Sequence, residues 1–168
     1  MKVNALERTE LLVDAIIQGE SAGDPMRVGS SGERGLMQIM SGTWKDVTRD
    51  MFGRPINFDR AFQPEWNRRV GRGYLAHIHA TLQPHKEKWM SDERSLVIAA
   101  YNGGLGRLEK GGYNLDHMPA STKDYVARVT ALHDLYVAQR EGTNEEWAQR
   151  PAPAGDTAQV ADRLTLGS

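Results

Sequence analysis

The stretch IIQGESAGDPMRVGSSGERGLMQIM, residues 16–40, joins the end of an apolar helix to a glycine-rich loop and a short apolar run. Upstream of it, residues recur at the spacing i, i+3, i+4 and i+7 of one helix face: Val13, Ile16, Ile17 and then Glu20. The pattern places Glu20 at the end of an apolar stripe, where partial exclusion of water disfavours a charged carboxylate. The sequence therefore predicts a helix that presents a sheltered acid to the loop after it.

This helix is expected to begin at about residue 5, because Asn4 is a suitable N-cap and Glu7 completes a capping box. The Gly-Asp-Pro sequence at residues 23–25 sets its end. A glycine-rich loop follows. The run after that loop, LMQIMSGTW, is too short for its period to decide between helix and strand.

Three more helices are expected downstream. One runs from Pro64 to about Leu82, the next is capped by Ser91, and the last begins at Ser121 or Thr122 and ends at Glu141-Gly142. Residues 96–100 are apolar nearly all round, so the second of these should be the central buried helix. The buried face of the first is predicted to hold Asn67, Val70, Tyr74, Ile78 and Leu82. Strand signals are scarce, so the predicted fold class is mainly α, with little or no β.

The length of 168 residues suits one domain, which we expect at residues 1–148, followed by a flexible Pro/Ala-containing tail at residues 149–168. The formal net charge of −1 gives no general attraction for nucleic acid or an anionic membrane. No apolar run is long enough to insert in a membrane. No oligomerisation signal stands out, so a monomer is expected.

Metal sites are also not expected. The chain has no cysteine, which excludes disulfides and thiolate ligands. His77 and His79 point to different helix faces, and with His85 they are expected to be structural or solvated. The cluster Arg68, Arg69 and Arg72 is expected to form a solvated face, with contacts to substrate carboxylates as a lesser alternative.

Four blocks occur in a characteristic order: Glu20-Ser21, then Gly32 with Gly35-Leu36-Met37-Gln38-Ile39, then Ala100-Tyr101-Asn102-x-Gly104, then Tyr125-Val126. Over roughly residues 8–137, this set closely resembles the catalytic domain of the soluble (SLT), goose-lysozyme-like lytic transglycosylases. The resemblance implies a lysozyme-like helical domain whose cleft holds peptidoglycan glycan strands. It also implies cleavage of the β-1,4 bond between N-acetylmuramic acid and N-acetylglucosamine, with formation of 1,6-anhydromuramyl ends.

The chain departs from the family pattern at two positions. The family usually has serine nine residues after the glutamate, where this chain has Gly29 followed by Ser30 and Ser31. Either serine could supply the hydroxyl if the loop shifts by a residue. The last family block commonly begins with a glutamate, whereas this chain has Ser121 there. The second acid of the family is therefore missing from that block.

A single acid suffices when the substrate supplies the attacking group. Glu20 is expected to protonate the leaving oxygen and then to accept the proton of the muramyl 6-hydroxyl, which attacks within the same sugar. By resemblance, Gln38 and Asn102 contact the N-acetyl groups and the leaving oxygen, and Tyr101 and Tyr125 line the cleft. Met40 would lie under a sugar ring, and Ser30 is the candidate for the loop hydroxyl. No metal or organic cofactor is needed.

Two alternatives stay open on the sequence alone. A muramidase-type hydrolase of the same fold would need a second acid to activate water, for which Asp24 and Glu33 are the candidates. An inactive glycan-binding or phage structural module would keep the fold without the activity. Action on the cell wall, in the periplasm or outside the cell, is expected. The first residues lack the apolar core of a Sec signal, so delivery by a bacteriophage holin, a virion or a specialised secretion machine is expected.

Overall fold

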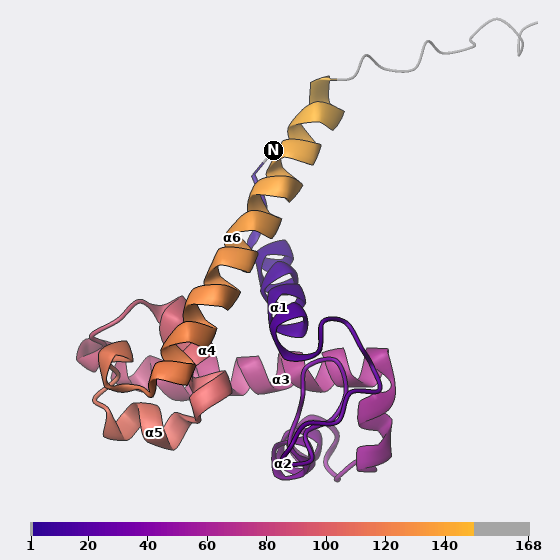
Figure 1. The fold of residues 1–168 in the computed structure, drawn as a ribbon, viewed down its shortest axis with the longest axis vertical. Helices are drawn as coiled ribbons and strands as arrows, with labels where there is room; N and C mark the ends of the chain where they lie inside the picture. The colour runs from indigo at the N-terminus through magenta and orange to yellow at the C-terminus, as the bar shows by residue number, and fades with distance from the viewer. Residues whose placement is uncertain (1, 150–168) are drawn as a thin grey trace, which may run out of the picture.

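The structure, a computed structural model, describes residues 2–149, and residues 150–168 of the expected tail lie outside this range. The described residues form α-helices joined by loops and short 3-10 helices (Figure 1). The helices are α1 (Ala5–Ser21), α2 (Ser41–Phe52), η1 (Phe58–Phe62), α3 (Pro64–Leu82), η2 (Gln83–Lys88), α4 (Glu93–Gly103), α5 (Leu105–Lys110), η3 (Leu115–His117) and α6 (Ala120–Gln149). The β structure described is limited to two isolated bridges, Val28 with Arg34 and Arg34 with Ile39. The predicted mainly α class is confirmed.

Helix α1 follows the prediction at both ends. The Asn4 side chain accepts from the Glu7 backbone N–H at 2.9 Å, and the Glu7 carboxylate accepts from the Asn4 N–H at 3.1 Å, which forms the capping box. The helix ends at Ser21, and Ala22 takes a left-handed conformation with φ of 53°. The buried Ser21 hydroxyl donates to the Ile17 carbonyl and accepts from the Gly23 N–H, so it serves the turn after Glu20.

Helices α3 and α4 agree with the prediction except at one cap. Helix α3 has the predicted bounds, and residues 96–100 of α4 are all buried. Ser91 is not the N-cap of α4. Asp92 precedes the helix in an extended conformation and accepts from the Ser95 N–H at 3.0 Å, whereas the Ser91 hydroxyl accepts from the Leu115 N–H. Ser91 is thus used to hold the segment before α6.

The end of α6 differs from the prediction. The helix continues through Gly142 to Gln149, because one glycine costs a helix only about 1 kcal/mol and does not by itself end it. Glu141 also has a tertiary partner, since its carboxylate accepts from the Val3 N–H at 3.1 Å. The stretch between α4 and α6 contains the short helix α5, and residues 36–38 of the undecided run form a turn before α2.

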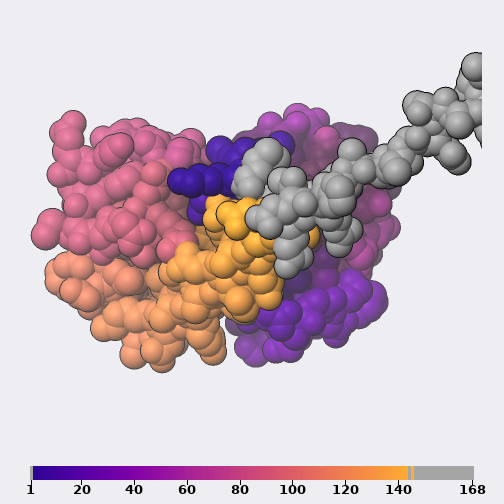
Figure 2. All heavy atoms as spheres, turned by 90° about the horizontal axis from the view of Figure 1, so that it is seen from above, coloured from indigo at the N-terminus to yellow at the C-terminus, as the bar shows by residue number. Residues whose placement is uncertain are grey.

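Helix α6 is the centre of the packing. It contacts both α1 and α4, and α3 runs across the lower ends of these helices (Figure 1). Seen from above, the segment after α1 and the segment that holds α4 and α5 lie on opposite sides of α6 (Figure 2). Trp44 is 1% exposed and donates from its indole N–H to the Ile56 carbonyl at 2.9 Å. It belongs to the core.

Two of the three clustered arginines form ion pairs between helices instead of pointing freely into solvent. Arg68 donates to Asp14 at 2.8 Å, and Arg72 makes a two-pronged contact with Glu10, so both tie α3 to α1. Arg69 lies over the Phe52 ring at 4.8 Å. These ion pairs are half-exposed, so each is expected to contribute little to stability.

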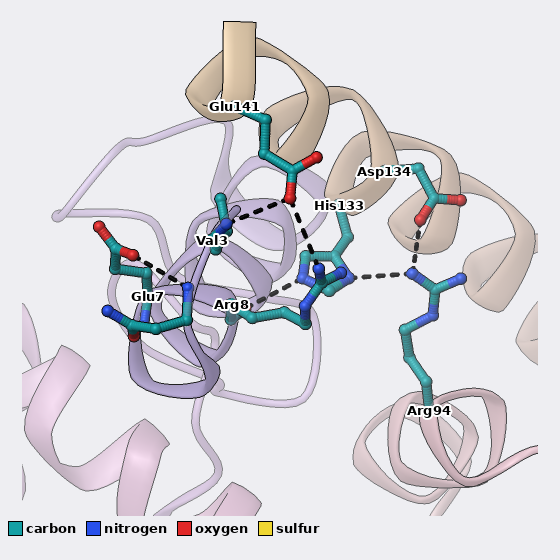
Figure 3. A network of polar contacts seen from close by, with 8 residues as sticks. Val3, Glu7, Arg8, Arg94, His133, Asp134 and Glu141 are labelled. Atoms are coloured by element: carbon teal, nitrogen blue, oxygen red, sulfur yellow. Dashed lines mark hydrogen bonds and ion pairs between the residues drawn. The ribbon is translucent and has the colours of Figure 1, made fainter. Parts of the chain in front are cut away.

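A polar network joins α1, α4 and α6 near the start of α1 (Figure 3). The His133 ring, 3% exposed, lies between the Arg94 guanidinium, 3.1 Å from Nδ1, and the Arg8 carbonyl, 3.0 Å from Nε2. Arginine can only donate and a carbonyl can only accept, so this arrangement fits the neutral ring with its hydrogen on Nε2. Arg94 also donates to Asp134 at 2.6 Å. Burial lowers the pKa of His133, which favours the same neutral form.

Candidate active site

Glu20 lies in the last turn of α1, directly after the buried stripe of Val13, Ile16 and Ile17. Its side chain is half-buried, and desolvation raises the pKa of its carboxyl above the ordinary value. A contact with the Tyr125 hydroxyl lowers this pKa, and the charge of Glu33 raises it further. The expected sheltered acid is therefore present at the end of the stripe, and its protonated form is favoured.

Tyr125 is placed by α6 beside Glu20. The residue is 3% exposed, and its buried hydroxyl forms no well-aligned hydrogen bond within the described residues. It nevertheless lies near enough to Glu20 for each group to affect the pKa of the other. Burial and the charge of Glu20 raise the pKa of Tyr125, so the phenol stays neutral and can donate a hydrogen bond.

Tyr101 joins α4 to the loop after α1. Its hydroxyl donates to the Met37 carbonyl at 2.6 Å, and its ring packs against Tyr74 with centroids 5.4 Å apart and planes tilted by 50°. Burial, followed by the charge of Glu20, raises the pKa of Tyr101 well above the ordinary value. Tyr101 is therefore a neutral residue that holds the LMQI turn in place while lying within electrostatic range of the acid.

The loop after α1 is tied to α3 by Asn67, which is completely buried. Its Oδ1 accepts from the Met37 N–H at 2.8 Å, and its Nδ2 donates to the carbonyls of Arg34 and Ala61 at 2.9 and 2.8 Å. Gly35 lies directly against this amide with φ of +76°, and a Cβ there would lie 2.1 Å from the Ala61 oxygen. Only glycine fits this position, because both its conformation and its surroundings exclude a side chain.

Gln38 holds the loop from within. It has φ of 47°, and its Nε2 donates to the carbonyls of Arg27 and Gly35 at 3.0 and 2.9 Å. Both acceptors are carbonyls, so the nitrogen of the amide must face them. Oε1 remains available as an acceptor. The predicted contact between Gln38 and substrate would therefore use this oxygen, and the residue is in addition a brace for the loop.

Glu33 brings a second carboxylate to this region. A Cβ at Gly29 would lie 2.1 Å from Glu33 Oε2 and 2.9 Å from Gln38 Oε1, so the two side chains meet above Gly29. The other candidate second acid, Asp24, accepts from the Met26 N–H at 2.9 Å and is not among the groups that shift the pKa of Glu20. Of the two, only Glu33 is among the groups that shift the pKa of Glu20.

The remaining predicted residues are exposed. The side chains of Ser30 and Asn102 are exposed and make no hydrogen bond to the rest of residues 2–149. Met40 is 43% exposed at the start of α2. Tyr101 and Tyr125 thus lie close enough to Glu20 for its charge to raise their pKa values. Ser30, Met40 and Asn102 face solvent instead.

Two cations near Glu20 escaped the sequence analysis. Arg27, on the loop, and Arg128, on α6, are exposed and both lower the pKa of Glu20. Arg128 follows Tyr125 by three residues, and this spacing places it on the same side of the helix, which was the available signal. Arg27 gave no such signal in the sequence, because its distance from Glu20 depends on how the loop folds.

A cleft around Glu20 stays a prediction. A hollow of about 790 Å³ lies between the first half of α1, α3, α4 and His133. Another, of about 450 Å³, lies between α1 and α6. Neither contains a predicted site residue. Within residues 2–149, no group of three or more His, Asp or Glu side chains could hold a metal ion, and no helix is long and apolar enough to cross a bilayer.

Comparison with known proteins gives a consistent set of relatives. A family profile described as "Transglycosylase SLT domain" matches residues 3–121. The chain is 40% identical over 100 residues to membrane-bound lytic murein transglycosylase C of Edwardsiella ictaluri, covering 58% of this chain and 27% of the relative. It is 30% identical over 154 residues to the soluble lytic murein transglycosylase of Salmonella typhimurium, covering 81% of this chain and 22% of the relative.

A similar fold occurs in an experimental structure. An inactive glutamate-to-glutamine mutant of the lytic transglycosylase Slt from Pseudomonas aeruginosa matches with a TM-score of 0.68 and 26% identity. The match covers 82% of this chain and 23% of that protein. The present chain spans about a quarter of the length of the curated relatives it matches.

Proposed function

Because the chain belongs to the transglycosylase SLT domain family, we propose that it is a lytic murein transglycosylase in which Glu20 is the catalytic acid and then the base. The substrate would be the glycan strand of peptidoglycan, cut between N-acetylmuramic acid and N-acetylglucosamine. One observation carries the proposal: Glu20 lies at the end of a buried apolar stripe, and desolvation raises the pKa of its carboxyl. A carboxyl whose pKa is raised keeps its proton to higher pH, and in that form it can donate to a leaving oxygen.

In the first step, the Glu20 carboxyl gives its proton to the glycosidic oxygen as the bond from the anomeric carbon breaks. The carboxylate that remains is stabilised by the Tyr125 hydroxyl and by the two nearby arginines, which favour the ionised form. In the second step, the 6-hydroxyl of the same muramyl sugar bonds to the anomeric carbon and its proton passes to Glu20. The acid is restored, and no water is consumed.

Intramolecular attack explains how one acid can be enough. The attacking hydroxyl belongs to the sugar under attack, so no second molecule has to be bound and oriented. Such an intramolecular arrangement can lower the activation barrier by about 7 kcal/mol or more. General acid–base catalysis by one positioned carboxyl contributes typically about 10²- to 10⁴-fold. Loss of the Glu20 acid should therefore remove nearly all measurable turnover.

The test is Glu20→Gln, with Asp24→Asn as matched control. Both substitutions remove one acid from the same region, and asparagine at residue 24 can keep the bond to the Met26 N–H. We expect E20Q to lose clearing of purified cell walls by at least about 100-fold while D24N clears normally. Clearing by E20Q would disprove the role of Glu20. An inactive binding module would clear nothing even as the unaltered protein.

A muramidase-type hydrolase is the second candidate, and the position of Glu33 favours it over the inactive module. Two carboxyl groups at one site are the usual equipment of glycoside hydrolysis. Mass spectrometry of digested cell walls separates the two reactions, because an anhydro end is lighter than a reducing end by one water. We expect anhydro ends from the unaltered protein.

A further inference from the structure

Arg34 is the middle residue of a three-segment contact in the loop between α1 and α2. Isolated bridges pair it with Val28 on one side and with Ile39 on the other. Its N–H donates to the Ile39 carbonyl at 3.1 Å, and the Ile39 N–H donates to its carbonyl at 3.2 Å. These two bonds close the turn of residues 35–38. The position of this end of the turn therefore depends on where Arg34 is held.

The Arg34 side chain is held by η1, which lies outside the loop. The guanidinium carbon is 4.3 Å from the centroid of the Phe58 ring and 5.0 Å from that of the Phe62 ring. Nη1 donates to the Asp59 carboxylate at 2.9 Å. Phe58, Asp59 and Phe62 thus form a clamp of two aromatic faces and one carboxylate around a cation. The Arg34 side chain is 29% exposed and that of Asp59 is 79% exposed, so this η1 clamp lies at the surface of the fold.

Two deeper residues hold the middle of the same turn. Asn67 of α3 accepts from the Met37 N–H at 2.8 Å, and Tyr101 of α4 donates to the Met37 carbonyl at 2.6 Å. Both of these bonds are made to Met37, whereas Arg34 is bonded to Ile39, directly after the turn. The turn therefore has two separate supports, a deeper one at Met37 and a surface one at Arg34.

Gln38 lies between these two supports in an unusual conformation. Its φ of 47° is in the left-handed region, which residues other than glycine adopt only where the surroundings hold them. Its Nε2 donates to the carbonyls of Arg27 and Gly35, so Oε1 is the atom that can accept from a substrate. The direction of this oxygen follows from the geometry of the turn. A small movement at Arg34 would therefore redirect it.

We propose that Arg34 is a positioning residue: held by the η1 clamp, it fixes the end of the turn that carries Gln38 and so orients Gln38 Oε1 toward the glycan. This inference rests on the proposed function and on the expected contact between Gln38 and substrate. Arg34 takes no part in the bond-making step. Because it acts through Gln38, its effect disappears when Gln38 has no oxygen to offer.

The test replaces Arg34 by methionine, which keeps an unbranched side chain and removes the guanidinium. Arg60→Met is the matched control. The Arg60 guanidinium, on the same 3-10 helix, also lies over an aromatic ring, 4.9 Å from the centroid of Trp66, and within residues 2–149 its side chain makes no hydrogen bond or ion pair with the loop. Thermal melting should show a similar small decrease in Tm for both variants, because each loses one surface contact between a cation and an aromatic ring.

The two variants should differ in activity on purified glycan strands. We expect R34M to lower kcat/KM about 10-fold, since a misplacement of about 1 Å can cost about 100-fold and the backbone pairs of Arg34 remain. R60M should leave kcat/KM unchanged. Arg34→Lys should recover only part of the loss, because an ammonium keeps the charge but cannot lie flat between two rings.

A double variant separates positioning from general destabilisation. Gln38→Ala removes the oxygen that Arg34 positions, so R34M/Q38A should have the same kcat/KM as Q38A alone. If R34M fails to fold, R34K and R34K/Q38A are compared in the same way.

Each outcome decides the inference. Unchanged kcat/KM in R34M or in Q38A overturns it, and so do losses that multiply in the double variant. Equal losses in R34M and R60M also overturn it, because they assign the effect to stability. The products of the unaltered protein test the proposed function separately, since reducing ends would contradict the transglycosylase reaction whatever the kinetics of R34M.

Discussion

Replacing Asn67 by leucine should destabilise the loop between α1 and α2. The Asn67 amide is 0% exposed and makes three hydrogen bonds, to the Met37 N–H and to the carbonyls of Arg34 and Ala61. Leucine has a similar volume but no polar atom. The substitution therefore leaves the Met37 N–H and the Ala61 carbonyl, both in fully buried surroundings, without their partner, whereas the Arg34 carbonyl still accepts from the Ile39 N–H at 3.2 Å.

The magnitude follows from the Met37 N–H and the Ala61 carbonyl. A buried donor or acceptor left without a partner costs about 1 to 3 kcal/mol, and the Arg34 carbonyl should add little because it keeps its bond from the Ile39 N–H. The sum is about 2 to 6 kcal/mol of unfolding free energy, a large share of the ~5 to 15 kcal/mol of an ordinary domain. In a domain of this size, the same loss lowers Tm by about 10 °C.

Urea denaturation followed by circular dichroism measures the difference, with Asn57→Ala as the matched control. Asn57 makes one exposed hydrogen bond, to the Asp59 N–H, so its removal should cost no more than about 1 kcal/mol. Clearing activity should fall in N67L even below its melting temperature, because the Met37 carbonyl that Tyr101 holds is part of the released segment. A loss in N67L no greater than in N57A would refute the reasoning.

Three further outcomes are expected. Glu20→Gln should be as stable as the unaltered protein or more stable, and the gain should grow as pH rises. The reason is that the raised pKa of Glu20 makes its ionisation destabilise the folded state. A less stable variant in urea denaturation at pH 8 would contradict this. Tyr125→Phe should move the alkaline limb of the clearing rate to higher pH, because the hydroxyl lowers the pKa of Glu20. The same change should alter the free energy of unfolding by less than about 1 kcal/mol, because that hydroxyl lacks a full hydrogen bond. The free energy of unfolding should fall as pH drops below about 6.5, because His133 binds a proton more readily in the unfolded chain than in the folded chain, where its pKa is lowered. In denaturation at pH 7.5 and 5.5, His133→Gln should lose less stability on acidification than the unaltered protein. An equal loss in both proteins would contradict this.

Local patterns in the sequence were enough for the regular elements. The capping box of Asn4 and Glu7, the bounds of α3 and the buried run of α4 involve residues that are neighbours along one helix, so the spacing of side chains settles them. The same local logic placed Glu20 at the end of its apolar stripe. It failed at the end of α6, where the helix continues past a glycine.

The setting of the acid depended on the tertiary structure. Asn67 reaches Met37 across 30 residues, Tyr101 reaches the same residue across 64, and the approach of Arg128 and Glu33 to Glu20 exists only once α6 and the loop are packed together. Spacing along the chain cannot report such contacts, because they depend on how separate elements meet in space. The sequence alone therefore predicted Glu20 as the candidate acid, and the packing of the loop, α4 and α6 decided which charged groups surround it.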